Sequence, residues 1–197
     1  MRLFVAVDLP DETTRVIAAE QKLIAAPLVK SGDSLKLVAP ERLHLTLLFL
    51  GEVQEARVPA VIDAMNSAVD LPAFDIAFGG AGVFPPRGAP RVLWLGVTEG
   101  AASLTRLQHE IAERIRELGI PFDDRPFHPH LTLGRWRESR SGRAARGRRR
   151  RDRGPLSGSG VVVGVRVTRA TLYQSRLSSS GPAYTALAHV NLSENNE

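Results

Sequence analysis

The tetrapeptide His-Leu-Thr-Leu occurs twice in this chain, at residues 44–47 and 130–133, and this repeat restricts the fold more than any other feature. The chain has only five histidines among its 197 residues, yet two of them open the same tetrapeptide, 130 − 44 = 86 positions apart. Alternate side chains of a β-strand share a face, so each copy predicts a strand with His and Thr on one side and leucines on the other. We expect the leucines to be buried. If the two polar faces oppose each other, two imidazoles and two hydroxyls meet at one site.

This set of side chains suits the cleavage of a phosphodiester without a metal. One imidazole must be neutral, to take a proton from the attacking oxygen, and the other must be charged, to protonate the departing oxygen. Histidine can do both because its unperturbed pKa of about 6.5 lies near working pH. Threonine hydroxyls can donate hydrogen bonds to non-bridging phosphate oxygens, where charge is held in the transition state. The pattern marks His44 and His130 as candidate acid and base, and Thr46 and Thr132 as candidate phosphate-binding residues, without telling acid from base.

Two other interpretations of the repeat remain open at this point. Strand alternation alone places polar residues at every second position, so each motif could simply face water. A metal site is the third interpretation, because His128 and His130 are two residues apart and two aspartates precede them at 123–124. Pro129 between the histidines, and the lack of a matching set around His44, weaken the metal interpretation.

Strands and helices alternate along the chain without the regular βα spacing or glycine-rich turn of a nucleotide-binding parallel sheet, which favours an α+β fold. Two similar series, each with strands, a helix and a His-containing strand, indicate two related halves. Apolar periodicity and turn residues predict strands at 2–8, 43–50, 74–78, 91–97, 130–133, 161–173 and 184–192, helices at 13–29, 55–69 and 99–118, and a glycine- and proline-rich loop at 79–90.

Composition excludes several classes of protein. The chain has no cysteine, so it has no disulfide framework, no thiolate metal site and no cysteine nucleophile. It has no run of about 18 apolar residues that could span a membrane. The first residues turn polar at Asp8 without a small-residue cleavage site, so they predict a first strand and not a signal peptide. We therefore expect a soluble, cytoplasmic protein.

The net charge of +5 is concentrated in one segment. Residues 137–153 contain nine arginines and two acidic residues, 9 − 2 = +7, so the other 180 residues carry 5 − 7 = −2. Residues 137–160 have almost no apolar side chains, which predicts an arginine-rich flexible loop within a single domain of residues 1–197. This segment could attract RNA to the protein, or it could equally be a tolerated surface insertion.

The motifs and their order resemble the two-histidine (2H) phosphoesterase superfamily, and most closely its RNA 2′,3′-cyclic phosphodiesterase branch, also called the 2′-5′ RNA ligase family. The resemblance runs through most of the chain, in the stretches RLFVAVDLP, RLHLTLLFLGEV, GVFPPRGAPRVLWLGV, RPFHPHLTLGR and ATLYQSRLSSSGPAYTALAHVNL. It implies a bilobal α+β fold with two pseudo-symmetric lobes. Each lobe would carry an antiparallel sheet with flanking helices, and the active-site groove would lie between them.

The same resemblance implies a reaction and the residues that perform it. The reaction is hydrolysis of a 2′,3′-cyclic phosphate at an RNA end to a 2′-phosphomonoester, without a metal. We also expect a monomer that uses no cofactor. His44 would be the proton donor to the leaving 3′ oxygen, and His130 would be the proton acceptor that activates water. Thr46, Thr132 and Arg135 would bind the substrate phosphate.

Arg135 matches a phosphate-contacting position of the family, and a guanidinium suits that role. Strict strand alternation from His130 would turn the Arg135 side chain to the opposite face. The resemblance therefore requires a bulge or a strand end near Gly134, which glycine permits.

Other functions are also compatible with the sequence. The same chemistry could act on a small cyclic phosphate, such as one on a nucleotide, or could run in reverse to join RNA ends through a 2′-5′ link. A non-catalytic RNA-binding module that uses the arginine-rich segment belongs to a different class. The intact His-Leu-Thr-Leu in both halves argues against an inactive enzyme.

Overall fold

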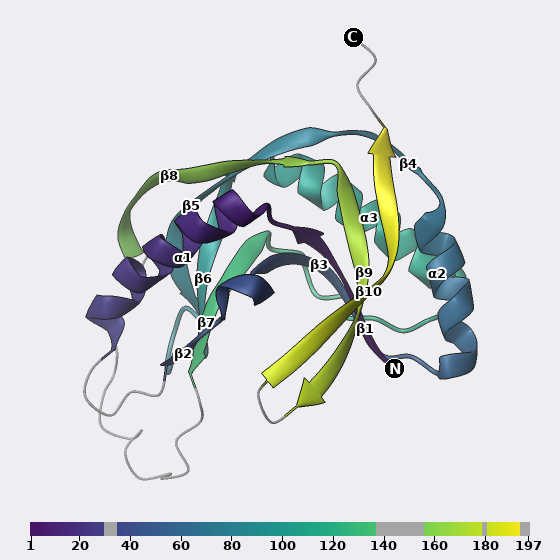
Figure 1. Cartoon of the computed structure of the whole chain (residues 1–197), viewed down its shortest axis with the longest axis horizontal. Coiled ribbons are helices and arrows are strands. Elements are labelled where there is room, and N and C mark those ends of the chain that lie inside the picture. The colour runs from purple at the N-terminus through teal and green to yellow at the C-terminus, as the bar shows by residue number, and fades with distance from the viewer. Residues whose placement is uncertain (30–34, 137–155, 179–180, 194–197) are drawn as a thin grey trace.

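A computed structural model describes residues 1–29, 35–136, 156–178 and 181–193 of the protein (Figure 1). Its longer elements are β1 (Arg2–Asp8), α1 (Asp11–Ala25), β2 (Leu35–Leu37), β3 (His44–Glu52), α2 (Val58–Asn66), β4 (Val69–Pro72), β5 (Phe74–Phe84), β6 (Val92–Glu99), α3 (Ala101–Glu117), β7 (His130–Trp136), β8 (Leu156–Val167), β9 (Arg169–Ser178) and β10 (Gly181–Ser193). Short 3₁₀ helices occur at Ala26–Leu28 (η1), Pro40–Arg42 (η2) and Glu55–Arg57 (η3).

The strands of the described residues form two five-stranded sheets. The first sheet has the order β3-β1-β9-β10-β4, and the second has the order β2-β7-β6-β5-β8. The paired strands are antiparallel, except that β4 runs parallel to β10. The predicted α+β fold with two sheets and flanking helices is confirmed. The first sheet is mixed and not purely antiparallel, because α2, which contacts β10, delivers the short strand β4 alongside β10 in the same direction.

Each sheet combines strands from the earlier and the later part of the chain. The last two strands, β9 and β10, complete the sheet that contains β1 and β3, whereas β2 joins the second sheet. The helices cross over as well, since α1 contacts β8 of the second sheet and α3 contacts β3 and β4 of the first (Figure 1). The lobes therefore do not correspond to the two consecutive halves that the sequence pattern indicated. The predicted strand at 161–173 is two strands, because the chain passes from the second sheet to the first at Thr168.

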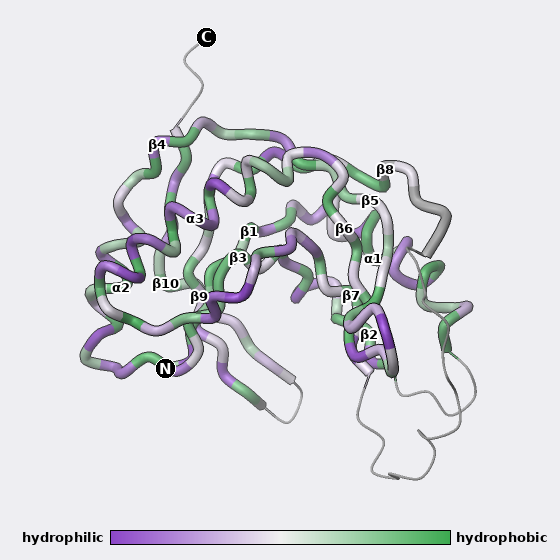
Figure 2. Tube along the Cα trace, turned by 180° about the vertical axis from the view of Figure 1, so that it is seen from behind, coloured by the Kyte–Doolittle hydropathy of each residue, from purple (hydrophilic) through white to green (hydrophobic). Residues whose placement is uncertain are grey.

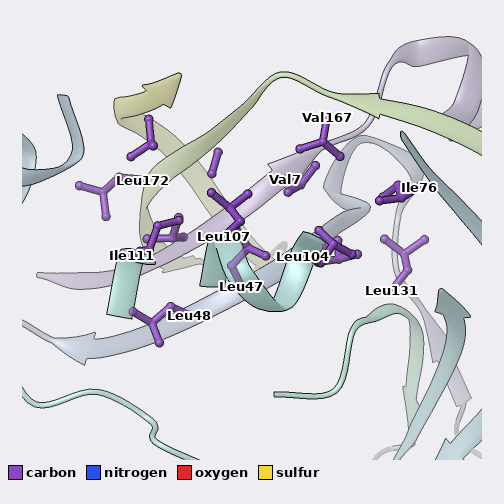
Figure 3. Close-up of a cluster of buried hydrophobic side chains, with 14 of the residues drawn as sticks. Val7, Leu47, Leu48, Ile76, Leu104, Leu107, Ile111, Leu131, Val167 and Leu172 are labelled. Carbon is purple, nitrogen blue, oxygen red and sulfur yellow. The ribbon is translucent and has the colours of Figure 1, made fainter. Parts of the chain in front are cut away.

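The two sheets share one hydrophobic core, and the leucines of both motifs lie in it. Leu45 and Leu131 are 0% exposed, so their predicted burial is confirmed. Figure 3 shows Leu47 of the first motif and Leu131 of the second in one cluster with Leu104 and Leu107 of α3. Fully burying a leucine side chain contributes about 1.5–3 kcal/mol, and a one-residue slip of either strand would exchange these leucines for the polar residues. Burial of the leucines thus fixes which face the His and Thr residues occupy.

The helices place one face on this core and the other in solvent. In Figure 2, hydrophobic and hydrophilic residues alternate along α3, which is typical of such helices. The buried residues of α3 are Leu104, Leu107, Ile111, Ala112 and Ile115. No helix in the described ranges is long and apolar enough to cross a membrane.

Two predicted loops are shorter than expected. The glycine-rich part of the predicted loop at 79–90 belongs to β5, which continues to Phe84 and pairs with β6 and β8. The predicted arginine-rich loop at 137–160 overlaps β8, which begins at Leu156. Backbone hydrogen bonds to β5 hold this part of β8, and such bonds do not require apolar side chains. Residues 137–155 lie outside the described residues.

Candidate active site

The two His-Leu-Thr-Leu motifs lie on strands that contact each other across the two sheets. His44 begins β3, at the edge of the first sheet, and His130 begins β7, the second strand of the other sheet. β3 and β7 are in contact, although no strand pairing joins them. The structure therefore brings the two motif strands into contact.

Both imidazole rings are held in the same way. The Nδ1 atom of His44 lies 2.8 Å from the carbonyl oxygen of Arg42, and the Nδ1 atom of His130 lies 2.6 Å from the carbonyl oxygen of His128. A carbonyl can only accept a hydrogen bond, so Nδ1 is the donor in each ring. This arrangement leaves Nε2 of each histidine for chemistry. His128 contributes its backbone oxygen to the orientation of His130.

The threonines of the motifs share the faces of the histidines. In the strand pairing, Thr46 lies opposite Ala6 while His44 lies opposite Asp8, two residues further along β1. The four motif side chains are half-buried, at the boundary between core and solvent. Among the described residues, neither threonine hydroxyl has a hydrogen-bond partner, so both can bond a phosphate oxygen.

A bulge in β7 turns Arg135 to the motif face. Thr132 and Gly134 pair with two consecutive residues of β6, so Leu133 between them is an extra residue on β7. The extra residue shifts the alternation by one and places Arg135 on the same face as Thr132. The bulge that Arg135 requires near Gly134 is therefore present in the structure.

Burial and the charge of Arg135 lower the pKa of both imidazoles. Burial is the main cause for both His44 and His130, and the hydrogen bond to a backbone carbonyl partly offsets it in each. The positive charge of Arg135 lowers both pKa values further. One guanidinium thus acts electrostatically on both histidines, which come from different sheets.

Aromatic rings from two strands pack against the imidazole of His44. The ring of Phe4 on β1 lies 5.0 Å from the His44 ring, and Tyr184 on β10 makes an edge contact with it at 5.3 Å. The ring of Tyr173 on β9 stacks on the ring of Phe4, at 5.3 Å. These rings give His44 an apolar wall on one side. Neither Phe4 nor Tyr184 was predicted from the sequence.

A hydrogen-bonded carboxylate also lies beside His44. Asp8 is the β1 partner of His44, and its charge raises the pKa of His44 against the larger effect of burial. Its two oxygens accept hydrogen bonds from Thr171 and Tyr173, each at 2.6 Å. Burial, followed by this bond to Asp8, raises the pKa of Tyr173 well above its ordinary value. These hydrogen bonds hold the Asp8 carboxylate in place beside His44.

The second motif has an aromatic wall of its own. Phe84 makes an edge contact with the His130 ring at 5.2 Å and lies 5.2 Å from the ring of Trp94. Trp94 is the β6 partner of Thr132, so its indole lies on the motif face of the sheet. The indole also lies against Gly82 of β5. Alternation of glycine with bulky residues across β5 and β6 was the signal in the sequence that could have located this wall.

Replacing Gly82 with alanine is expected to lower the free energy of unfolding by about 1–3 kcal/mol, because overpacking forces neighbours out of position. A Cβ atom at Gly82 would overlap the indole ring of Trp94. The displaced indole would also move Phe84, which contacts His130, so turnover should fall with stability. Denaturant unfolding measures the first effect.

Gly164→Ala is the matched control for this prediction. Gly164 also lies in the second sheet, but a Cβ there would meet only the carbonyl oxygen of Ile76, at an ordinary 3.6 Å. Its stability is expected to match that of the unmodified protein. An equal decrease in the free energy of unfolding in the two variants would show that Gly82 is not needed to make room for the indole.

Two of the residues considered for a metal site, Asp123 and His130, bond other protein groups. Asp123 pairs with Arg125 through both carboxylate oxygens, and Nδ1 of His130 donates to the His128 carbonyl. In the ranges that the structure describes, no three His, Asp or Glu side chains are grouped as metal ligands would be.

Comparisons with known proteins agree on one family. The sequence model of the 2′-5′ RNA ligase superfamily matches residues 17–177. A relative from Archaeoglobus fulgidus named RNA 2′,3′-cyclic phosphodiesterase is 45% identical over 138 residues, which cover 68% of this chain and 72% of the relative. A relative of the same name from Thermus thermophilus is 34% identical over 201 residues, with 98% and 90% covered. The crystal structure of TT0787 of Thermus thermophilus has a TM-score of 0.78 and 30% identity, with 100% of both chains covered. The chain therefore belongs to the 2′-5′ RNA ligase superfamily of 2H phosphoesterases.

Proposed function

We propose that this protein hydrolyses the 2′,3′-cyclic phosphate at an RNA end to a 2′-phosphomonoester. The observation that carries the proposal is the contact between the two motif strands, with Arg135 acting electrostatically on both imidazoles. The relatives named RNA 2′,3′-cyclic phosphodiesterase support the substrate class.

The proposed reaction is an in-line displacement at phosphorus. Nε2 of neutral His130 takes a proton from water as the water oxygen bonds to phosphorus. The bond from phosphorus to the 3′ oxygen breaks, and Nε2–H of charged His44 protonates that oxygen. The products are a 2′-phosphomonoester and a free 3′ hydroxyl. Exchange with solvent then returns each histidine to its starting state.

The other polar residues of the site would stabilise the charge on phosphate. The hydroxyls of Thr46 and Thr132 donate to the non-bridging oxygens, one from each sheet. The guanidinium of Arg135 adds a fixed positive charge and charge-assisted hydrogen bonds. The acid, the base and these donors are all side chains, so the proposed mechanism uses no metal.

The surroundings of the two histidines support different roles for them. Against the dominant effect of burial, Asp8 favours the charged form of His44, as a proton donor requires. Among the described residues, no carboxylate acts on His130 in this way. Burial and the positive charges of Arg135 and His128 disfavour the charged form of His130, as a proton acceptor requires. These differences support His44 as the donor and His130 as the acceptor.

The dependence of kcat/KM on pH is expected to be bell-shaped and centred below the ordinary histidine pKa of about 6.5, because both pKa values are lowered. Activity falls at low pH as the acceptor His130 becomes charged, and at high pH as the donor His44 becomes neutral. Replacing Asp8 with asparagine removes a charge that raises the pKa of His44. The fraction of charged His44 above both pKa values then decreases, so this variant should lose activity at neutral and higher pH.

Asp70→Asn is the control, since Asp70 is an exposed residue of β4 in the same sheet. Because Asp8 also accepts hydrogen bonds, thermal unfolding should be recorded for both variants. An Asp8→Asn variant that is folded and keeps full activity at neutral and higher pH would contradict the assignment of His44 as the donor.

A further inference from the structure

The helix α1 carries a buried glutamine, Gln21. Gln21 is 2% exposed and occupies the face of α1 that packs on the core. The other buried residues of this face are Thr13, Ile17 and Ala25. An amide at such a position costs free energy unless its hydrogen-bonding groups find partners, so an apolar residue would serve packing alone better.

The amide of Gln21 bonds to the bulge of β7. Nε2 donates to the carbonyl oxygen of Leu133 at 2.6 Å and to that of Val38 at 2.9 Å. The N–H of Val38 donates to the same Leu133 oxygen at 2.9 Å. Leu133 is the extra residue of the bulge and has no partner on β6. The Gln21 amide and the Val38 N–H therefore hold the one peptide of β7 that lies outside the regular pairing with β6.

The orientation of this peptide decides where Arg135 points. The strand before the bulge carries Thr132 on the motif face, and only the extra residue brings Arg135 back to that face. Beyond the bulge, Gly134 and Arg135 pair with Leu37 and Lys36 of β2, directly before Val38. Gln21 therefore ties α1 to the point where β7 changes its alternation.

We propose that Gln21 is a positioning residue for Arg135. Its amide holds the Leu133 carbonyl and so keeps the bulge that directs the guanidinium toward the two histidines. The inference rests on the proposed function for the catalytic value of Arg135, but the coupling between the two residues can be tested without substrate.

The first test measures the pKa of each histidine by NMR titration of the imidazole signals. Arg135→Ala removes a charge that lowers the pKa values of His44 and His130, so both should rise. Gln21→Met keeps the size of the side chain and removes the amide donor, and both pKa values should rise in the same direction. The double variant should match Arg135→Ala alone, because Gln21 acts through Arg135.

The other charged and titratable groups that act on the histidines limit how this result can be explained. They are Asp8 for His44 and His128 for His130, and neither bonds to Gln21. Unchanged pKa values in the Gln21→Met protein would overturn the proposal. A rise that adds fully to that of Arg135→Ala in the double variant would also overturn it.

The second test is the same cycle in kcat/KM for a 2′,3′-cyclic phosphate. Arg135→Ala should lower kcat/KM, and Gln21→Met should lower it by a smaller factor, up to about a hundredfold, because a small misplacement of a catalytic group has effects of that size. The double variant should be no slower than Arg135→Ala. A purely structural role of Gln21 predicts instead a further loss in the double variant.

Thr13→Val is the matched control, because Thr13 is the other buried polar residue on the same face of α1. It should leave both histidine pKa values and kcat/KM unchanged, whatever it does to stability. If Gln21→Met does not fold, Gln21→Asn replaces it, since its shorter side chain keeps polarity but cannot reach both carbonyls. An unmodified protein without hydrolytic activity would contradict the proposed function, and the NMR cycle would still decide the positioning role.

Discussion

Replacing either His44 or His130 with alanine is expected to lower kcat/KM for a 2′,3′-cyclic phosphate by about 10²–10⁴-fold, the usual contribution of a general acid or base. The two motifs come from different sheets and supply one imidazole each, so neither motif can act as donor and acceptor in the same step. Release of the phosphomonoester from a 2′,3′-cyclic nucleotide measures the effect. The double variant should lose little more than the slower single variant, because residues that act as a unit are not additive.

His109→Ala is the control for the two histidine variants. His109 is 68% exposed on α3, its Nδ1 lies 3.9 Å from a carboxylate oxygen of Glu113, and it belongs to neither motif. It should retain full activity. Circular dichroism and thermal unfolding should show that all three variants are folded. Turnover close to that of the unmodified protein in either the His44 or the His130 variant would rule out the proposed acid and base pair.

Replacing Thr46 or Thr132 with valine is expected to lower kcat by about 10²–10³-fold, as does the loss of one donor to a charged transition state. Valine has nearly the same shape as threonine and lacks the hydroxyl. The charge on the non-bridging oxygens is held most strongly in the transition state, so kcat should fall by a larger factor than KM rises. Steady-state kinetics separates the two.

Stability distinguishes this role from a structural one. Within the described part of the chain, the two hydroxyls bond no other group, so neither valine variant should lose stability. Thr105→Val is the control, because the Thr105 hydroxyl donates to the Ala101 carbonyl on the exposed side of α3. It should keep full activity. Variants at Thr46 and Thr132 that lose stability but keep kcat would assign these hydroxyls to folding.

The motif strands could be predicted from the sequence because strand alternation is a local property. The spacing of His44 and Thr46 by two residues places both on one face and sends Leu45 to the core, and the structure agrees. The bulge could also be predicted, because the role of Arg135 conflicted with strict alternation and Gly134 offered a place where the strand could adjust.

The residues that surround the motifs could not be predicted, because they depend on pairing between distant strands. Asp8 lies beside His44 only through the register of β1 with β3, and Tyr184 reaches the same ring from the last strand. No local pattern tells which sheet a strand joins. The sequence therefore could not predict that β2 joins the second sheet and β9 joins the first. Gln21 did leave a signal, since it is a polar residue four positions after Ile17 on the apolar face of a helix.

The most direct test is the identity of the product formed from an RNA oligonucleotide that ends in a 2′,3′-cyclic phosphate, with and without EDTA. The proposed mechanism predicts a 2′-phosphomonoester with a free 3′ hydroxyl, formed at the same rate in both conditions. A parallel assay with a cyclic mononucleotide shows whether the enzyme prefers the RNA end. Joined RNA ends as the main product would favour 2′-5′ ligation. A 3′-phosphate product would contradict the assignment of the 3′ oxygen as the leaving group. Binding without turnover, or loss of activity in EDTA, would contradict the proposal that two imidazoles alone supply the acid and the base.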